Sequence, residues 1–133
     1  MSVIVDTSVW SLALRRKETP DFDPQIIKLT SLLNSNQPIF LLGVIIAEIL
    51  QGIRNEKTFE AVKDHLNAFQ IIELEREDYI ESAKLRNLCL NKGITIQTID
   101  AIIATASIKN GIPLLTSDKD FSNIASITSL QLL

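Results

Sequence analysis

Val3-Ile4-Val5-Asp6, at the start of the chain, is the stretch that decides the fold. Three consecutive β-branched residues predict a buried strand, and Asp6 marks its carboxyl end. Two further short apolar runs, IFLL at 39–42 and PLLT at 113–116, predict more strands of the same kind. Because helical patterns separate these runs, we expect an α/β domain built around a mostly parallel sheet.

Helix boundaries are marked by capping residues. Asp23 followed by Pro24 is typical of an N-cap and a first helical residue, and Ile26, Leu29 and Leu33 then form an apolar stripe at helical spacing. Glycines mark the other ends, so that helices are predicted over 76–92 and 98–110, the first stopping at Gly93 and the second at Gly111. Residues 127–132 are predicted to form a last strand.

The composition bounds the class of protein. The chain has 133 residues, 46% of them hydrophobic and 22% charged, which predicts one globular domain over residues 1–133 and excludes a disordered chain. Cys89 is the single cysteine, so a disulfide scaffold is excluded and a reducing compartment is favoured. No apolar run is long enough to span a membrane, and we expect a cytoplasmic protein without a membrane partner.

Three acidic residues lie in apolar surroundings, where a carboxylate is costly. Asp6 ends the first strand, Glu48 lies within VIIAEIL, and Asp100 lies within IQTIDAIIA. Each of them alone has an ordinary alternative role, capping a helix or facing a solvent gap. An unpaired ionised carboxylate costs several kcal/mol to bury, and these segments hold no lysine or arginine, so the three together indicate a metal site.

Topology supports one shared site for these acids. Asp118 follows the strand predicted at 113–116 just as Asp6 follows the first strand, and ligands of open α/β sheets bind beyond the carboxyl ends of strands. Asp100 falls in the first turn of its predicted helix, where we expect the helix dipole to keep it ionised at neutral pH. Carboxylates without a histidine or thiolate set favour Mg²⁺ or Mn²⁺ over zinc. We expect His65 to be exposed and Cys89 to be a core residue.

The net charge adds a constraint on any nucleic-acid partner. The chain carries −3 at pH 7, whereas a domain that binds nucleic acid through a general basic face is strongly basic. A bound cation, together with local positive charge, would then have to hold the phosphates.

Four motifs in order resemble the PIN domain: VDTS from residue 5, AEILQG from 47, IDAIIATA from 99 and LLTSDKDF from 114. They span essentially the whole chain, and its size resembles the toxin ribonucleases of toxin–antitoxin systems. The resemblance implies a three-layer α/β/α fold and a metal-dependent endoribonuclease that cleaves RNA. Its catalytic and metal-binding carboxylates would be Asp6, Glu48, Asp100 and Asp118.

The resemblance also implies roles for individual residues. Asp6 and Asp100 would be the core ligands of Mg²⁺ or Mn²⁺, Asp118 would complete the ligand set, and Glu48 would bind the metal or orient the attacking water. Asp120 and Thr116 match positions that support the same pocket in the family. The family further implies a small antitoxin as partner and a homodimer. The candidates for contact with the RNA backbone are basic residues: Arg15, Arg16, Lys17 and Arg54.

Other classes of function stay open at this point. A phosphatase with Asp6 as nucleophile typically needs a second acid two residues later, where Ser8 stands. A phosphoacceptor domain of the receiver type leaves Glu48 without a role. A non-catalytic RNA-binding or scaffold domain with the same fold has no need of four carboxylates, and metal-dependent cleavage would separate it from the enzyme.

Overall fold

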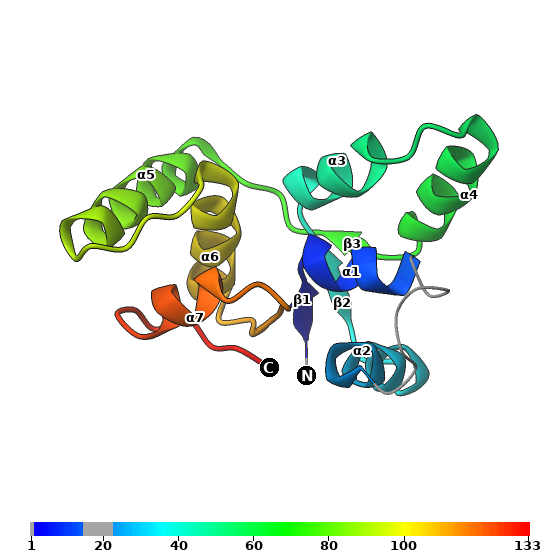
Figure 1. Cartoon of the computed structure of the whole chain (residues 1–133), viewed down its shortest axis with the longest axis horizontal. Coiled ribbons are helices and arrows are strands. Elements are labelled where there is room, and N and C mark those ends of the chain that lie inside the picture. Colours follow the sequence, from blue (N-terminus) through cyan, green and yellow to red (C-terminus); the bar gives the residue numbers. More distant parts are fainter. Residues whose placement is uncertain (1, 15–22) are drawn as a thin grey trace.

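The structure, a computed structural model, describes residues 2–14 and 23–133 of the chain. Strands and helices alternate along most of the sequence, as Figure 1 shows. In chain order they are β1 (Val3–Val5), α1 (Thr7–Leu14), α2 (Pro24–Asn34), β2 (Ile39–Leu41), α3 (Gly43–Gln51), α4 (Glu56–Leu66), β3 (Gln70–Ile71), α5 (Arg76–Asn91), α6 (Thr98–Asn110), β4 (Leu114–Leu115) and α7 (Asp120–Ala125).

The strands form one parallel sheet in the order β3-β2-β1-β4. The first strand is central: Ile4 is in register with Phe40 of β2 on one side and with Leu114 of β4 on the other. All three residues of β1 are fully buried, which explains why this stretch is apolar and β-branched throughout. The predicted parallel α/β fold is confirmed.

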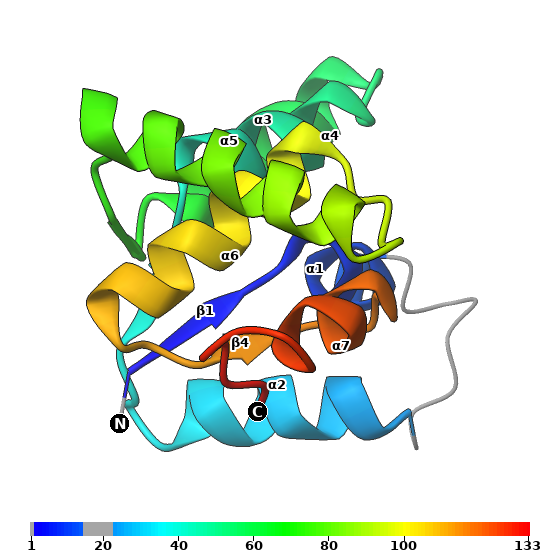
Figure 2. The same cartoon turned by 90° about the vertical axis from the view of Figure 1, so that its left-hand side faces the viewer.

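Helices cover both faces of the sheet and produce three layers. In Figure 1, α5, α6 and α7 lie on one side of β1, whereas α1 to α4 lie on the other; the turned view in Figure 2 shows α5, α6 and α7 in front of the strand. The apolar core includes Leu41, Ile45, Ile103 and Phe121, all fully buried between these layers. The α/β/α arrangement therefore places every strand end between two helical layers.

The predicted helix ends follow their capping residues. The Asp23 carboxylate accepts hydrogen bonds from the backbone N–H groups of Gln25 and Ile26, at 2.9 and 3.3 Å, and α2 begins at Pro24. At the end of α6, Gly111 adopts a left-handed conformation with φ of 63°, which a residue without a side chain reaches at little cost.

Two local predictions were wrong, and one helix was missed. Leu33 is 46% exposed, and Leu32 is buried in its place together with Ile26 and Leu29, because the helix turns its i, i+3, i+6 positions to the core. Residues 127–132 form no strand, and their one ladder contact is an isolated bridge between Leu132 and Leu114. The six-residue helix α7 was not predicted, since so short a segment shows no periodicity.

Across the described ranges 2–14 and 23–133, the helices are too short or too polar to span a bilayer.

Candidate active site

Five carboxylates from separate parts of the chain line one cavity of about 470 Å³, which we call the acidic cavity. Asp6 follows β1, Glu48 belongs to α3 and Asp100 to the first turn of α6. Asp118 lies between β4 and α7, and Asp120 is the first residue of α7. The remaining lining residues are neutral: Thr7, Ser8, Ser11, Leu12, Gln97 and Ser117.

Parallel pairing of β1 with β4 brings two of these acids to the same sheet edge. Val5 is in register with Leu115, and the Asp6 backbone N–H donates to the Leu115 carbonyl at 2.9 Å. Thr116, the residue that follows β4, donates its hydroxyl to Oδ2 of Asp6 at 2.9 Å. Because both strands end here, the residues that follow them share the crevice beyond the sheet.

Asp100, Asp118 and Asp120 form the most compact part of the acidic cavity. Each offers a carboxylate oxygen within 4.8 Å of those of the other two. The backbone N–H of Asp120 donates to Oδ1 of Asp118 at 2.9 Å, which holds the turn into α7 in place. Three converging carboxylates are the oxygen-only ligand set of a hard divalent cation, so the residues present fit a metal site.

Asp100 shows the electrostatic cost of this convergence. Burial raises the pKa of the Asp100 carboxyl to about 7, and the negative charges of Asp118, Asp6, Asp120 and Glu48 contribute to the same shift. The expectation that the dipole of α6 keeps Asp100 fully ionised at neutral pH was therefore wrong for the protein without a cation. A divalent cation would reverse the balance by supplying the missing positive charge.

Glu48 reaches the acidic cavity from the opposite helical layer. Its side chain is half-buried on α3, and Oε1 accepts a hydrogen bond of 2.9 Å from the hydroxyl of Thr7 on α1. Because α1 and α3 pack against each other, this hydrogen bond fixes the carboxylate relative to the end of β1. The second Glu48 oxygen belongs to no hydrogen bond among the described residues.

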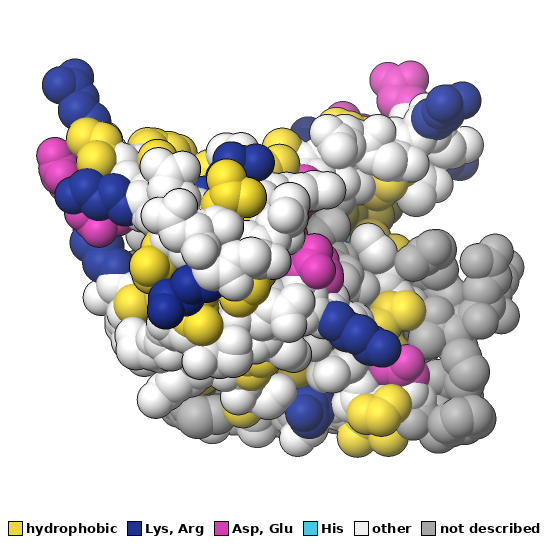
Figure 3. All heavy atoms as spheres, turned by 60° about the vertical axis from the view of Figure 1, so that its left-hand side comes forward, with side chains coloured by type: hydrophobic (Ala, Val, Ile, Leu, Met, Phe, Trp, Pro, Cys, Tyr) yellow, Lys and Arg dark blue, Asp and Glu magenta, His cyan; other side chains and the backbone are white. Residues whose placement is uncertain are grey.

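Basic residues take no part in the described lining of the acidic cavity. Arg54 is exposed and follows the end of α3, outside that lining, whereas Arg15, Arg16 and Lys17 lie outside the described residues. On the face in Figure 3, the coloured Lys and Arg side chains are spread over the surface rather than gathered into one patch. This pattern agrees with the net charge of −3.

Hydroxyl and amide groups around the acids were missed from the sequence. No role at the site was predicted for Thr7 or Ser8, although both donate hydrogen bonds to carboxylates of the acidic cavity. Gln97 and Ser117 also line it. The available signal was position, because all four lie within three residues of a candidate acid.

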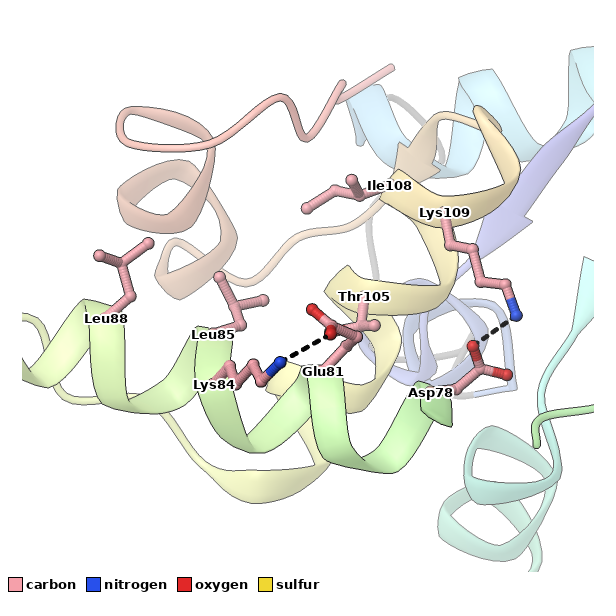
Figure 4. A pocket seen from close by; sticks show the side chains of 8 residues that line it. All are labelled: Asp78, Glu81, Lys84, Leu85, Leu88, Thr105, Ile108 and Lys109. Carbon is pink, nitrogen blue, oxygen red and sulfur yellow. Dashed lines mark hydrogen bonds and ion pairs between the residues drawn. The ribbon is translucent and has the colours of Figure 1, made fainter. Parts of the chain in front are cut away.

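Asp78 is a buried acid that lies outside the acidic cavity. Although it lies in an acidic stretch at the start of α5, it is 3% exposed, caps the Glu75 backbone N–H at 2.7 Å and pairs with Lys109 of α6 at 2.6 Å. Figure 4 shows this pair beside a largely apolar pocket of about 460 Å³ between α5 and α6. The pair and the cap lower the pKa of Asp78.

His65 is exposed on α4 and Cys89 is fully buried, as predicted. Burial raises the pKa of the Cys89 thiol, which keeps it protonated and unsuited to metal binding. Carboxylates therefore remain the ligand chemistry of the site.

A sequence profile of the PIN domain matches residues 3–127, a span that contains all five carboxylates of the acidic cavity. The chain belongs to the PIN-domain family. Membership of this family accounts for both the observed fold and the four sequence motifs.

Individual PIN-domain relatives cover nearly the whole chain. VapC ribonuclease Mb1587 of Mycobacterium bovis is 26% identical over 132 residues, which cover 97% of this chain and 96% of that protein. Ribonuclease VapC11 of Mycobacterium tuberculosis matches with the same identity and coverage. Among solved structures, VapBC2 from Rickettsia felis, bound to a DNA fragment from its promoter, superposes with a TM-score of 0.79 at 22% identity, over 100% of this chain and 98% of that chain.

Proposed function

We propose that this PIN-domain protein is a metal-dependent endoribonuclease, the RNA-cleaving toxin of a toxin–antitoxin pair. The observation that carries the proposal is the convergence of five carboxylates on one cavity without a basic residue in its described lining. Curated relatives that align over almost the full chain are named as ribonucleases, which supports RNA as the substrate. Residues 1–133 would act as a single PIN-like domain.

The carboxylates have distinct places around the cation that we propose, Mg²⁺ or Mn²⁺. Asp100, Asp118 and Asp120 would hold it, since their oxygens already lie within 4.8 Å of one another. Asp6 would add a ligand from the end of β1, and Glu48 would orient the attacking water from α3. The cation supplies Lewis-acid chemistry, making water acidic enough to attack at neutral pH and offsetting charge on the phosphate in the transition state.

The reaction is hydrolysis of a phosphodiester. A bond forms between the water oxygen and phosphorus while the bond from phosphorus to the 3′ oxygen breaks, and that oxygen leaves with a proton. Glu48 is placed to take the proton from water, because its only described hydrogen-bond donor, Thr7, occupies one carboxylate oxygen. Thr116 would contribute by holding Asp6 through its hydroxyl.

Arg54 remains our candidate for contact with the RNA backbone outside the acidic cavity, together with Arg15, Arg16 and Lys17. A cation in the cavity would bind the reacting phosphate itself, so these residues would have to hold only the flanking nucleotides.

The test is cleavage of a pool of single-stranded and structured RNA with Mg²⁺ or Mn²⁺, with chelator, and with two variants. Asp100→Asn should abolish cleavage with its fold intact, and Asp64→Asn, an exposed change on α4 outside the acidic cavity, should leave it unchanged. Cleavage that persists in chelator or in Asp100→Asn would refute the assignment. Metal binding by the wild-type protein without cleavage of any RNA would favour the scaffold alternative.

We also propose an antitoxin as protein partner. The similar structure from Rickettsia felis is that of VapBC2, and a further similar structure, VapBC-5 from Mycobacterium tuberculosis, is a member of the VapBC family of toxin-antitoxin systems. An apolar cavity of about 320 Å³, bordered by the exposed Leu14 and Leu33, offers a surface for such a partner. Leu33→Asp should weaken a complex formed on co-expression with a candidate antitoxin, as measured by size-exclusion chromatography.

We also propose that the protein forms a homodimer, which light scattering of the purified chain would test. We further propose that it lies in the cytoplasm, because the lone thiol of Cys89 and an RNA substrate both favour that compartment.

A further inference from the structure

Ser8 occupies the centre of a hydrogen-bond network that joins the ends of β1 and β4. Its hydroxyl donates to Oδ2 of Asp6 at 2.8 Å and accepts from the backbone N–H of Ser117 at 2.9 Å. Thr116 makes the matching pair of contacts, donating to the same Oδ2 at 2.9 Å and accepting from the backbone N–H of Asp118 at 3.0 Å. Two hydroxyls, one from the start of α1 and one from the residue after β4, thus converge on one oxygen.

The direction of each hydrogen bond follows from counting protons. A hydroxyl has one proton to donate, whereas a backbone N–H can only donate. Because Ser117 and Asp118 donate to the two hydroxyls, the protons of Ser8 and Thr116 are free to point at the carboxylate. The contact between the two hydroxyls is longer, at 3.2 Å, and could use only one of those protons.

This arrangement distinguishes the two oxygens of Asp6. Oδ2 is occupied by both hydroxyls, and no hydrogen bond within the described ranges reaches Oδ1. The Asp6 side chain is 5% exposed and lines the acidic cavity. With Oδ2 held against the sheet end, Oδ1 is the oxygen left for a ligand in the cavity.

We propose that Ser8 is a positioning residue that, with Thr116, holds Asp6 so that Oδ1 is presented to the divalent cation. The inference rests on the proposed function and extends it to a residue outside the acidic set. Hydroxyls suit this task because they stabilise a carboxylate without adding a positive charge that would compete with the cation. Groups that orient a metal ligand typically contribute about 10- to 100-fold in metal affinity or activity.

The experiment measures Mn²⁺ and Mg²⁺ binding to the whole chain by calorimetry, with the metal alone as probe. Ser8→Ala should raise the Kd about 10-fold or more, and Ser8→Thr, which keeps the hydroxyl, should bind nearly as the wild type does. Ser31→Ala, the same change at an exposed position of α2 outside the acidic cavity, is the matched control and should leave the Kd unchanged.

Kinetics provide a second readout. For Ser8→Ala, kcat should be reduced at a low concentration of the divalent cation and should recover as that concentration is raised. The KM for RNA should stay the same, because the substitution weakens only the binding of the metal. A Kd for Ser8→Ala within twofold of the wild-type value overturns the inference. If Ser8→Ala does not fold, Ser8→Cys keeps the shape with a weaker donor, and the same criteria apply to it.

These experiments distinguish failure of the proposed function from failure of the positioning role of Ser8. A wild-type chain that binds no metal refutes the proposed function and this inference with it. A wild type that binds metal and cleaves RNA, beside a Ser8→Ala variant with the same Kd, refutes only the role of Ser8.

Discussion

At the scale of single residues, the site is organised around a carboxyl group in an unfavourable place. Burial and four neighbouring carboxylates raise the pKa of Asp100 to about 7, so the fold without a cation stores electrostatic repulsion. Groups with a perturbed pKa in a cavity are typical of functional sites, and a nearby cation would stabilise the charged form of this partly buried carboxyl. The same repulsion predicts how the stability of the protein depends on pH.

The metal-free protein should lose stability as the pH rises from about 4 towards 7. A carboxyl whose folded pKa lies above its unfolded value of 3.8 binds more protons in the folded state across that window, so deprotonation favours unfolding. Asp100→Asn removes the titrating carboxyl and should therefore raise the Tm at pH 8 relative to wild type, with a smaller difference in Tm at pH 4.

Thermal unfolding in chelator over pH 4 to 8 measures this dependence. Asp64→Asn, an exposed change on α4, is the control and should follow the wild-type curve. A Tm of Asp100→Asn equal to or below the wild-type value at pH 8 would contradict the prediction.

At the scale of elements, caps and one ion pair determine how helices begin and pack. α2 begins at a side-chain cap, and α5 begins at the capping box of Glu75 and Asp78. Asp78 also joins α5 to α6 through Lys109, and α6 carries Asp100 at its start. This ion pair adds to the packing between α5 and α6 at the end of α6 opposite to Asp100.

Removing the cap of α2 should destabilise the fold without affecting the site. Asp23→Ala leaves the N–H groups of Gln25 and Ile26 without their acceptor, and we expect a loss of about 1 kcal/mol in the free energy of unfolding. Urea denaturation measures the loss. RNA cleavage per folded molecule should be unchanged, and a drop in it would show that α2 acts on the acidic cavity.

The Asp78–Lys109 pair should make α5 and α6 sensitive to acid. The pKa of Asp78 is lowered, so its stabilising effect is present above the unfolded value of 3.8 and is lost as the pH falls through the lower folded value. Asp78→Asn should therefore be less stable than wild type at pH 7, and the gap should narrow below pH 4.

The control for this pair is Glu81→Gln, which breaks the exposed Lys84–Glu81 pair one turn along α5 and should change little. Circular dichroism during acid titration of all three proteins provides the comparison. A gap that stays constant with pH would contradict the prediction, because both the ion pair and the cap depend on an ionised Asp78.

At the scale of the whole molecule, the two helical layers meet at the acidic cavity, with Glu48 on one side and Asp100 on the other. A cation there would link the layers as well as serve the chemistry. A ligand that binds only the folded state stabilises it by about 2.7 kcal/mol at 100 times its Kd.

Mg²⁺ or Mn²⁺ should therefore raise the Tm of the wild-type chain in a concentration-dependent way. Asp100→Asn should lose most of that shift, because it removes one of the three compact carboxylates. Thermal unfolding across a metal titration tests this, with Na⁺ at equal ionic strength as control. A wild-type Tm that does not respond to metal would refute a cation site in the folded protein.

Local patterns alone were enough to predict much of the fold. The helix over 98–110 with its stop at Gly111, the start of α2 at Pro24 and the strand at Val3–Val5 all depend on residues adjacent in sequence. The cost of burying a carboxylate and the positions of the strand ends also indicated Asp6, Glu48, Asp100 and Asp118, all of which line the acidic cavity. An unpaired carboxylate within an apolar run is unfavourable in any tertiary structure, so its presence points to a ligand.

Contacts between distant segments decided the rest. Whether Leu32 or Leu33 faces inward depends on how α2 packs in the fold. Asp78 is buried where α5 packs on α6, and its ion-pair partner Lys109 lies 31 residues further along the chain. The hydroxyl network of Ser8 and Thr116 exists because parallel pairing places two strand ends side by side. The sequence by itself determined the elements and the kind of ligand chemistry, since these are local. Only the tertiary structure decided which atoms face one another, because pairing register and helix packing depend on the whole chain at once.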